Sequence, residues 1–173
     1  LTAAQKANRE GELKFLRAFY YWHIVELWGG VHFTTEPTEG VITTANRTPV
    51  DTFYSQIFKD LNFAVANLPL TSTQFGRTTQ PVAKAFLARM LLTRGRNEEA
   101  ITLSNDVIKN YGLALQAKYI DIWNMSNLKS KEIIWSVDYS TVLTFNDLAT
   151  TTFPNGHSRG SNNGHLMFLM VYD

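Results

Sequence analysis

The chain has 173 residues and a formal net charge of +1, and it contains no cysteine. This length is sufficient for one domain with a substantial core, and the lack of cysteine excludes disulfides, thiolate metal sites and a cysteine nucleophile within this stretch. The 16 lysines and arginines are scattered and are balanced by 15 acidic residues, so no basic stripe suggests nucleic acid as a partner.

The first predicted element is a helix from about Ala3 or Gln5 to Trp28, ended by the pair Gly29-Gly30. Apolar side chains cover almost its whole circumference. A helix of this kind must be covered on several sides by other elements, so we expect it in the middle of a helical assembly. One face carries Leu16, Tyr20, Ile24 and Leu27, a second Phe15, Phe19 and Trp22, and a third Ala18, Tyr21, Val25 and Trp28.

A second helix is predicted after the loop of residues 31–47. Its start combines a hydroxyl cap at Thr48, a proline in the first turn at Pro49 and a carboxylate near the positive helix end at Asp51. Pro69 ends it. Its apolar positions form a stripe on one face: Val50, Phe53, Tyr54, Ile57, Phe58, Leu61, Ala64, Val65 and Leu68.

The third helix is predicted from about Thr79-Gln80-Pro81 to Gly95, and the fourth from a cap at Asn97 to Gly112. Only residues 95–97 separate them, so they must pack antiparallel. Residues 1–112 are therefore predicted to form two helical hairpins, an arrangement typical of helical-repeat proteins. The expected buried side of the fourth helix consists of Ala100, Ile101, Val107, Ile108 and Tyr111.

Residues 113–173 have a different character and are predicted to form an irregular second region. One short helix is expected within residues 115–125, and a strand over residues 132–139, which are rich in β-branched and aromatic side chains. Turn residues dominate after Thr141. Because the chain opens on a leucine and stops directly after an apolar run, we expect it to be a fragment of a longer protein.

Several residues invite a catalytic or metal-binding interpretation that the pattern does not support. His23 lies on an aromatic helix and is expected to be a core or groove histidine rather than a ligand. Glu36 and Glu39 lie in a loop, and no other group of residues in the sequence supports their use as a catalytic acid and base. His157 and His165 lack a third zinc ligand at suitable spacing. We therefore expect no catalytic residues, no metal and no cofactor.

The segment 155–164 is rich in asparagine, serine and glycine and is either a plain exposed loop or a ligand loop. Sugars are recognised by planar polar groups beside an aromatic face, which covers the apolar side of the ring. Trp135 has an aromatic side chain too, but it is expected in the core. The candidate ligand-binding residues are the polar side chains of His157, Arg159, Asn162 and Asn163, with Trp123 and Tyr139 as aromatic partners.

The third and fourth helices resemble a tetratricopeptide-type repeat, with Ala88 and Ala100 where that repeat needs small residues. The wider order of segments strongly resembles the SusD/RagB family of outer-membrane nutrient-binding lipoproteins. His32 departs from it, because the family usually has proline there. The matching segments are RAFYYW (17–22), LWGGV (27–31), YSQIFKDL (54–61), ANLP (66–69), GRTT (76–79), AKAFLAR (83–89) and EIIWSV (132–137).

The resemblance implies a mainly α fold of tetratricopeptide-like hairpins followed by an irregular region with short strand content. It implies non-catalytic binding of an oligosaccharide or another nutrient at the bacterial cell surface. The ligand would pass to a SusC-like TonB-dependent transporter. Ligand sites in this family are built largely from loops around and after the repeats, and its members are held to the outer membrane by a lipid anchor that this chain lacks.

Two other functions remain open at this stage. A tetratricopeptide-type module that binds only proteins would place lysine, arginine or asparagine along its concave face, and the first helix is too apolar for that role. A glycan hydrolase would need a carboxylate pair and would turn its ligand over, whereas a binding protein would retain the glycan unchanged.

Overall fold

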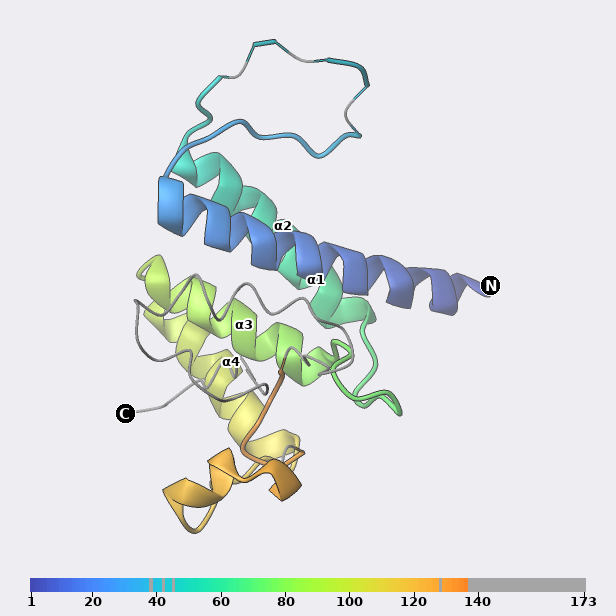
Figure 1. The fold of residues 1–173 in the computed structure, drawn as a ribbon, viewed down its shortest axis with the longest axis vertical. Helices are drawn as coiled ribbons and strands as arrows, with labels where there is room; N and C mark the ends of the chain where they lie inside the picture. Colours follow the sequence, from blue (N-terminus) through green and yellow to red (C-terminus); the bar gives the residue numbers. More distant parts are fainter. Residues whose placement is uncertain (38, 42, 45, 128, 137–173) are drawn as a thin grey trace, which may run out of the picture. The chain divides into compact units, whose positions relative to one another are not determined.

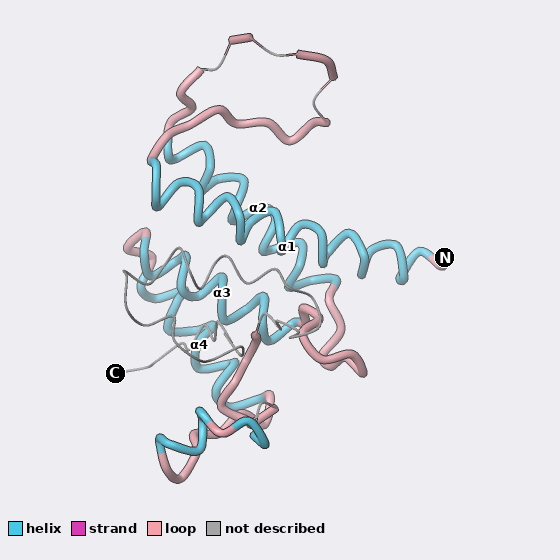
Figure 2. Tube along the Cα trace, viewed as in Figure 1, coloured by secondary structure: helices cyan, strands magenta, loops and turns pink. Residues whose placement is uncertain are grey.

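The computed structural model of the chain describes residues 1–37, 39–41, 43–44, 46–127 and 129–136. These residues form helices and loops, with no strand among them (Figures 1 and 2). The mainly α fold class is therefore confirmed. The helices are α1 (Ala3–Trp28), α2 (Val50–Asn67), α3 (Gln80–Thr93) and α4 (Asn97–Asn110), followed by the 3-10 helices η1 (Tyr119–Trp123) and η2 (Met125–Asn127).

The chain divides into two compact units. The first comprises residues 1–73 and 78–111 and contains the four α-helices; the second comprises residues 74–77 and 112–173 and contains η1 and η2. Within the first unit α1 packs on α2, α2 on α3 and α3 on α4. Within the residues that the structure describes, no helix combines the length and the apolar character needed to cross a membrane.

Helix α1 begins where the sequence predicts it, because its first turn is closed by a reciprocal cap. The Thr2 hydroxyl accepts from the backbone N–H of Gln5, and the Gln5 side chain accepts from the N–H of Thr2. Gly29 ends the helix with φ of 68°, a conformation that a residue without Cβ adopts freely. The backbone N–H of Gly29 donates to the carbonyl of Val25 at 2.9 Å.

Two of the three apolar faces of α1 are covered by other helices. Phe15 and Phe19 pack against Phe86 of α3, each with a ring-centroid distance of 5.7 Å, and Tyr21 packs against Phe53 of α2. The remaining face, which carries Leu16, Tyr20 and Leu27, is exposed among the described residues. The expected cover is therefore present on two sides of the helix.

A buried ion pair joins α1 to α2. Asp60 of α2 is fully buried, and both of its carboxylate oxygens accept hydrogen bonds of 2.7 Å from the guanidinium of Arg17 in α1. Gln56 donates a third bond, of 2.8 Å, to the same carboxylate. A carboxylate without water is costly unless it is paired in this way, so the pair fixes the register of the two helices.

Thr48 does not cap α2, contrary to the sequence-based expectation. The helix begins at Val50 with Pro49 at the cap position and no side-chain cap bond. Thr48 instead donates its backbone N–H to the carbonyl of Val31 at 2.9 Å, which closes the base of the loop 31–47. Gly30 makes this closure possible, because a Cβ there would lie 2.3 Å from the carbonyl oxygen of Thr48.

Helix α4 also differs from expectation at its start and on one face. Arg96 occupies the cap position without a side-chain cap bond, so Asn97 is the first helical residue rather than the cap. Ala100 and Val107 are buried, but Ile101 and Ile108 are more than half exposed. Each isoleucine follows a buried residue by one position and is rotated by about 100° from the face that packs on α3.

In the second unit, the short helix expected within residues 115–125 is found as η1 and the start of η2. The backbone of residues 132–136 is irregular, and the rest of the predicted strand, residues 137–139, lies outside the described residues. The predicted strand is thus not seen among the described residues 132–136. Their contact with residues 74–77 includes a side-chain hydrogen bond, in which the Trp135 indole N–H donates to the carbonyl of Gly76 at 2.9 Å.

Replacing Asp60 by alanine should destabilise the first unit by about 3 kcal/mol, because Arg17 would lose its buried partner. The matched control is Asp51→Ala, which removes a carboxylate that also pairs with an arginine, Arg94, but is 83% exposed. That change should have little effect, as is usual for exposed pairs. Urea unfolding of both variants measures the difference. If both variants lose the same free energy of unfolding, the buried ion pair of Asp60 contributes no more to stability than the exposed pair of Asp51.

Candidate functional site

Of the six candidate ligand residues, the structure describes only Trp123. The others, Tyr139, His157, Arg159, Asn162 and Asn163, lie outside the described residues. Trp123 is the last residue of η1 and is 49% exposed. A large aromatic side chain left this accessible is available for a ligand.

Trp123 does not stand alone, because Tyr119 lies one turn earlier on the same short helix. The two ring centroids are 5.9 Å apart and the ring planes meet at 68°. Tyr119 is 69% exposed. The sequence analysis missed Tyr119, although two aromatics four positions apart in a predicted helix, with Lys118 and Asp121 beside them, are a usable signal.

Contacts within the second unit fix η1 in place. Ile122 is its buried residue. The Asn127 side chain donates to the carbonyl of Asp121 at 3.0 Å and to the side-chain oxygen of Gln116 at 3.3 Å. The backbone N–H of Gln116 in turn donates to Glu132 at 2.6 Å. These bonds anchor the inner side of η1, so the segment that bears Tyr119 and Trp123 is fixed by contacts within the second unit.

This arrangement can bind the apolar face of a sugar ring. Stacking of a ring on an aromatic side chain buries apolar surface, and its magnitude for nucleic-acid bases is about 1–3 kcal/mol per ring. Lys118 and Asp121 flank the aromatic pair in sequence and supply a donor and an acceptor for hydroxyl groups. The chemistry available here is therefore recognition by stacking and hydrogen bonding.

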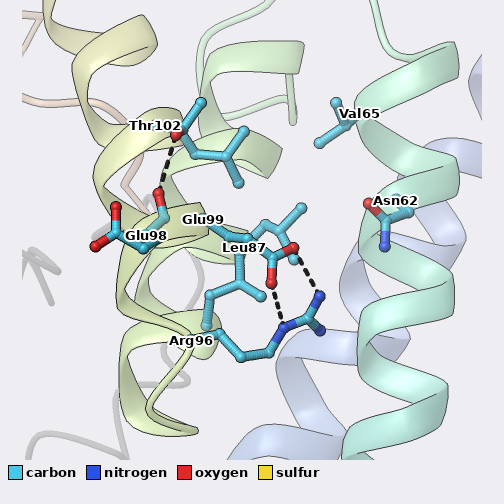
Figure 3. A pocket seen from close by; sticks show the side chains of 9 residues that line it. Asn62, Val65, Leu87, Arg96, Glu98, Glu99 and Thr102 are labelled. Atoms are coloured by element: carbon cyan, nitrogen blue, oxygen red, sulfur yellow. Dashed lines mark hydrogen bonds and ion pairs between the residues drawn. The ribbon is translucent and has the colours of Figure 1, made fainter.

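A pocket of about 380 Å³ lies within the first unit, between α2 and α4 (Figure 3). Figure 3 shows Asn62 and Val65 of α2 facing Thr102 and Glu99 of α4 across it. Its apolar lining is Val65, Leu87, Leu91 and Leu103, and its polar lining is Asn62, Arg96, Glu98, Glu99 and Thr102.

Many of the polar groups in this pocket already have partners inside the chain. Arg96 donates two bonds, of 2.6 and 2.7 Å, to the carboxylate of Glu99. The Thr102 hydroxyl donates to the carbonyl of Glu98, and the amide of Asn62 donates to the carbonyl of Phe58. The pocket is thus better suited to an apolar side chain of another protein than to a sugar.

His23 belongs to an aromatic cluster between α1 and α3. Its ring centroid lies 4.5 Å from that of Phe19 and 4.7 Å from that of Trp22, and the guanidinium of Arg89 lies over the Trp22 ring at 4.9 Å. Burial, and secondarily the charge of Arg89, lower the pKa of His23 below its usual value of 6.5. These surroundings match the interpretation of His23 as a core or groove residue.

The two loop carboxylates considered for catalysis are solvent-exposed. Glu36 and Glu39 are both exposed in the loop after α1. Among the residues that the structure describes, no three histidine, aspartate or glutamate side chains gather closely enough to hold a metal ion. His157 and His165 lie outside the described residues.

Comparison with known proteins gives consistent matches over the helical part. Residues 2–92 match the model of a SusD-like family described as starch-binding and associating with the outer membrane. The chain is 33% identical over 132 residues to SusD-like protein P25 of Formosa agariphila. That alignment covers 75% of this chain and 25% of the relative.

Two solved structures are similar in fold and in sequence. A laminarin-binding SusD-like protein superposes with a TM-score of 0.77 at 31% identity, covering 82% of this chain and 32% of that one. A structure solved with xylogluco-oligosaccharide gives a TM-score of 0.76 at 26% identity, covering 84% and 32%. The chain thus spans about a quarter to a third of the length of these relatives.

Acid should destabilise the first unit partly through His23. Because its pKa is lowered by folding, the unfolded chain binds the proton at higher pH, so stability falls as the pH drops through 6.5 toward the folded-state pKa. His23→Gln should therefore flatten the dependence of the melting temperature on pH between roughly pH 7.5 and 5.5. Thermal unfolding of both proteins across this range tests it. Parallel pH profiles would contradict the prediction.

Proposed function

This chain belongs to the SusD-like family of starch-binding proteins that associate with the outer membrane, and from that membership we propose that the protein containing it binds oligosaccharide at the bacterial cell surface without converting it. The observation that carries the proposal is the exposed aromatic pair Tyr119 and Trp123 on a short helix that internal hydrogen bonds anchor. The similarity to a laminarin-binding SusD-like protein supports a glycan as the ligand.

Binding without catalysis is supported by the setting of the loop carboxylates. A glycosidase needs one carboxyl group held neutral by an apolar surrounding, opposite a second one across the scissile bond. Glu36 and Glu39 are both solvent-exposed instead. Stacking with a few hydroxyl hydrogen bonds gives a weak complex that dissociates quickly, which suits the transfer of a ligand to another protein.

We further propose that the receiving protein is a SusC-like TonB-dependent transporter and that a lipid anchor outside this chain holds the protein at the outer surface. The family description, which includes association with the outer membrane, supports this location. The two helical hairpins supply a rigid surface, through the buried Arg17–Asp60 pair and the α3–α4 packing, against which a large partner can dock.

A second candidate function is binding of another protein without any glycan. The pocket between α2 and α4 favours it, because its leucine-lined floor fits an apolar side chain and its polar groups are largely engaged within the chain. The two functions make opposite predictions for polysaccharides, so one experiment separates them.

The protein should be retarded in native gels that contain a soluble polysaccharide, and no reducing sugar should be released. The scan includes starch, laminarin, xyloglucan, xylan, mannan and pectin. The double variant Tyr119→Ala/Trp123→Ala should lose the retardation, whereas Trp28→Ala, which removes another exposed tryptophan, should keep it. Release of sugar would indicate a hydrolase. Migration unchanged by every polysaccharide would favour the protein-binding alternative.

A further inference from the structure

The exposed face of α1 forms one continuous apolar stripe. Leu16, Tyr20 and Leu27 occupy positions i, i+4 and i+11, which lie within about 40° of one another around the helix axis. Their side chains are 37%, 61% and 67% exposed. Contiguous apolar surface of this kind usually marks an interaction site. The stripe extends over about three turns, a length that one helix packed alongside can cover.

A positive charge lies at the edge of this stripe. His23 is about 20° from Leu16 around the helix axis, on the border between the exposed face and the side of α1 that packs on α3. The guanidinium of Arg89, from α3, lies 4.9 Å from the centroid of the Trp22 ring. After burial, the charge of Arg89 is the second cause of the lowered pKa of His23, because the two side chains are close.

The guanidinium of Arg89 is accessible and is not paired with an acid. Arg89 is exposed, and no carboxylate of the described residues forms an ion pair with it. Its flat side lies over the Trp22 ring, so its N–H groups remain available at its edge. The partner that fits such a group best is a carboxylate, which can accept two parallel hydrogen bonds. Four other arginines of the first unit have a carboxylate partner: Arg9, Arg17, Arg94 and Arg96.

We propose that this face of α1 is covered by an amphipathic helix from the part of the polypeptide outside these 173 residues, and that an acidic side chain of that helix pairs with Arg89. Its apolar side chains pack on Leu16, Tyr20 and Leu27. Most of a protein of the relatives' length lies outside this chain, which spans about a quarter to a third of them. The cover is independent of glycan binding.

A cover from the same polypeptide suits this surface better than a separate partner. Three large apolar side chains in one stripe favour aggregation when they are left in water. A separate partner leaves them exposed each time it dissociates, whereas a covalently linked segment is always present. A linked segment also packs without the loss of translational freedom that association of two molecules costs.

Carbodiimide coupling in the longer protein that contains this chain identifies the acidic partner. The variant Arg89→Lys places an amine near the position of the guanidinium, and a carbodiimide joins an amine to a carboxylate in contact with it. We expect position 89 to be joined to an aspartate or glutamate of the same molecule outside residues 1–173, as read by mass spectrometry of tryptic peptides. Lys84, whose amine lies 2.6 Å from the Asp106 carboxylate, is the positive control.

Thiol labelling of the same longer protein measures whether the stripe is covered. These 173 residues contain no cysteine, so Tyr20→Cys introduces a single thiol in this region. It should react with a maleimide at least about tenfold more slowly in the native protein than in urea. Val41→Cys, at a loop position that is 92% exposed, is the matched control and should react at similar rates in both states. Circular dichroism confirms that each variant is folded.

Several results would overturn the proposal. One is coupling of position 89 only to an acid within residues 1–173, or no coupling there while Lys84 is joined to Asp106. Another is equally fast labelling of Tyr20→Cys and Val41→Cys in the native protein. Coupling between two molecules, or protection of Tyr20→Cys that is lost on dilution, would assign the face to a second copy of the protein instead.

Discussion

The ion pair between Arg17 and Asp60 is the constraint on which the helical unit depends. A fully buried carboxylate is unfavourable unless its oxygens are paired, and the two parallel bonds from one guanidinium satisfy it in a single relative placement of α1 and α2. With α1 held in that register, its aromatic side faces α3, where Phe86 receives Phe15 and Phe19. The polar pair thus determines which apolar side chains meet.

The packed helical core and the proposed ligand residues lie in different parts of the chain. The four helices bury nearly all of the large apolar core, and many polar groups around the pocket between α2 and α4 are engaged in hydrogen bonds within the chain. The described residues of the second unit have little regular structure, yet they carry Tyr119 and Trp123 on a short anchored helix. A loop-like segment can vary its side chains without disturbing a helical core, whereas a helix packed on both sides cannot.

Sequence patterns predicted the helices well because apolar periodicity and glycine stops act locally. The caps at Thr48 and Asn97 were predicted wrongly. Thr48 uses its backbone N–H to close a loop, and α4 begins one residue earlier than expected, with Arg96 at the cap position. Ile101 was assigned to the wrong face because periodicity alone does not tell which helix packs alongside. Tyr119 was missed although it lies four positions before Trp123 in a segment predicted to be helical, a spacing that places the two rings on one side. Trp123 was named because an aromatic ring suits a sugar; it is half exposed, and its role in binding stays a prediction.

Because contacts close the base of the loop 31–47, the length of that loop has little effect on the stability of the helices. The Thr48–Val31 bond, the bond from the Tyr21 hydroxyl to the carbonyl of Thr34 and the packing of Phe33 on Phe53 hold the two ends together. Doubling the number of residues between fixed ends costs only about 0.6 kcal/mol of closure entropy. This is therefore a place where insertions can accumulate during divergence, and where a fluorescent or affinity tag can be introduced, while the α1–α2 hairpin remains intact.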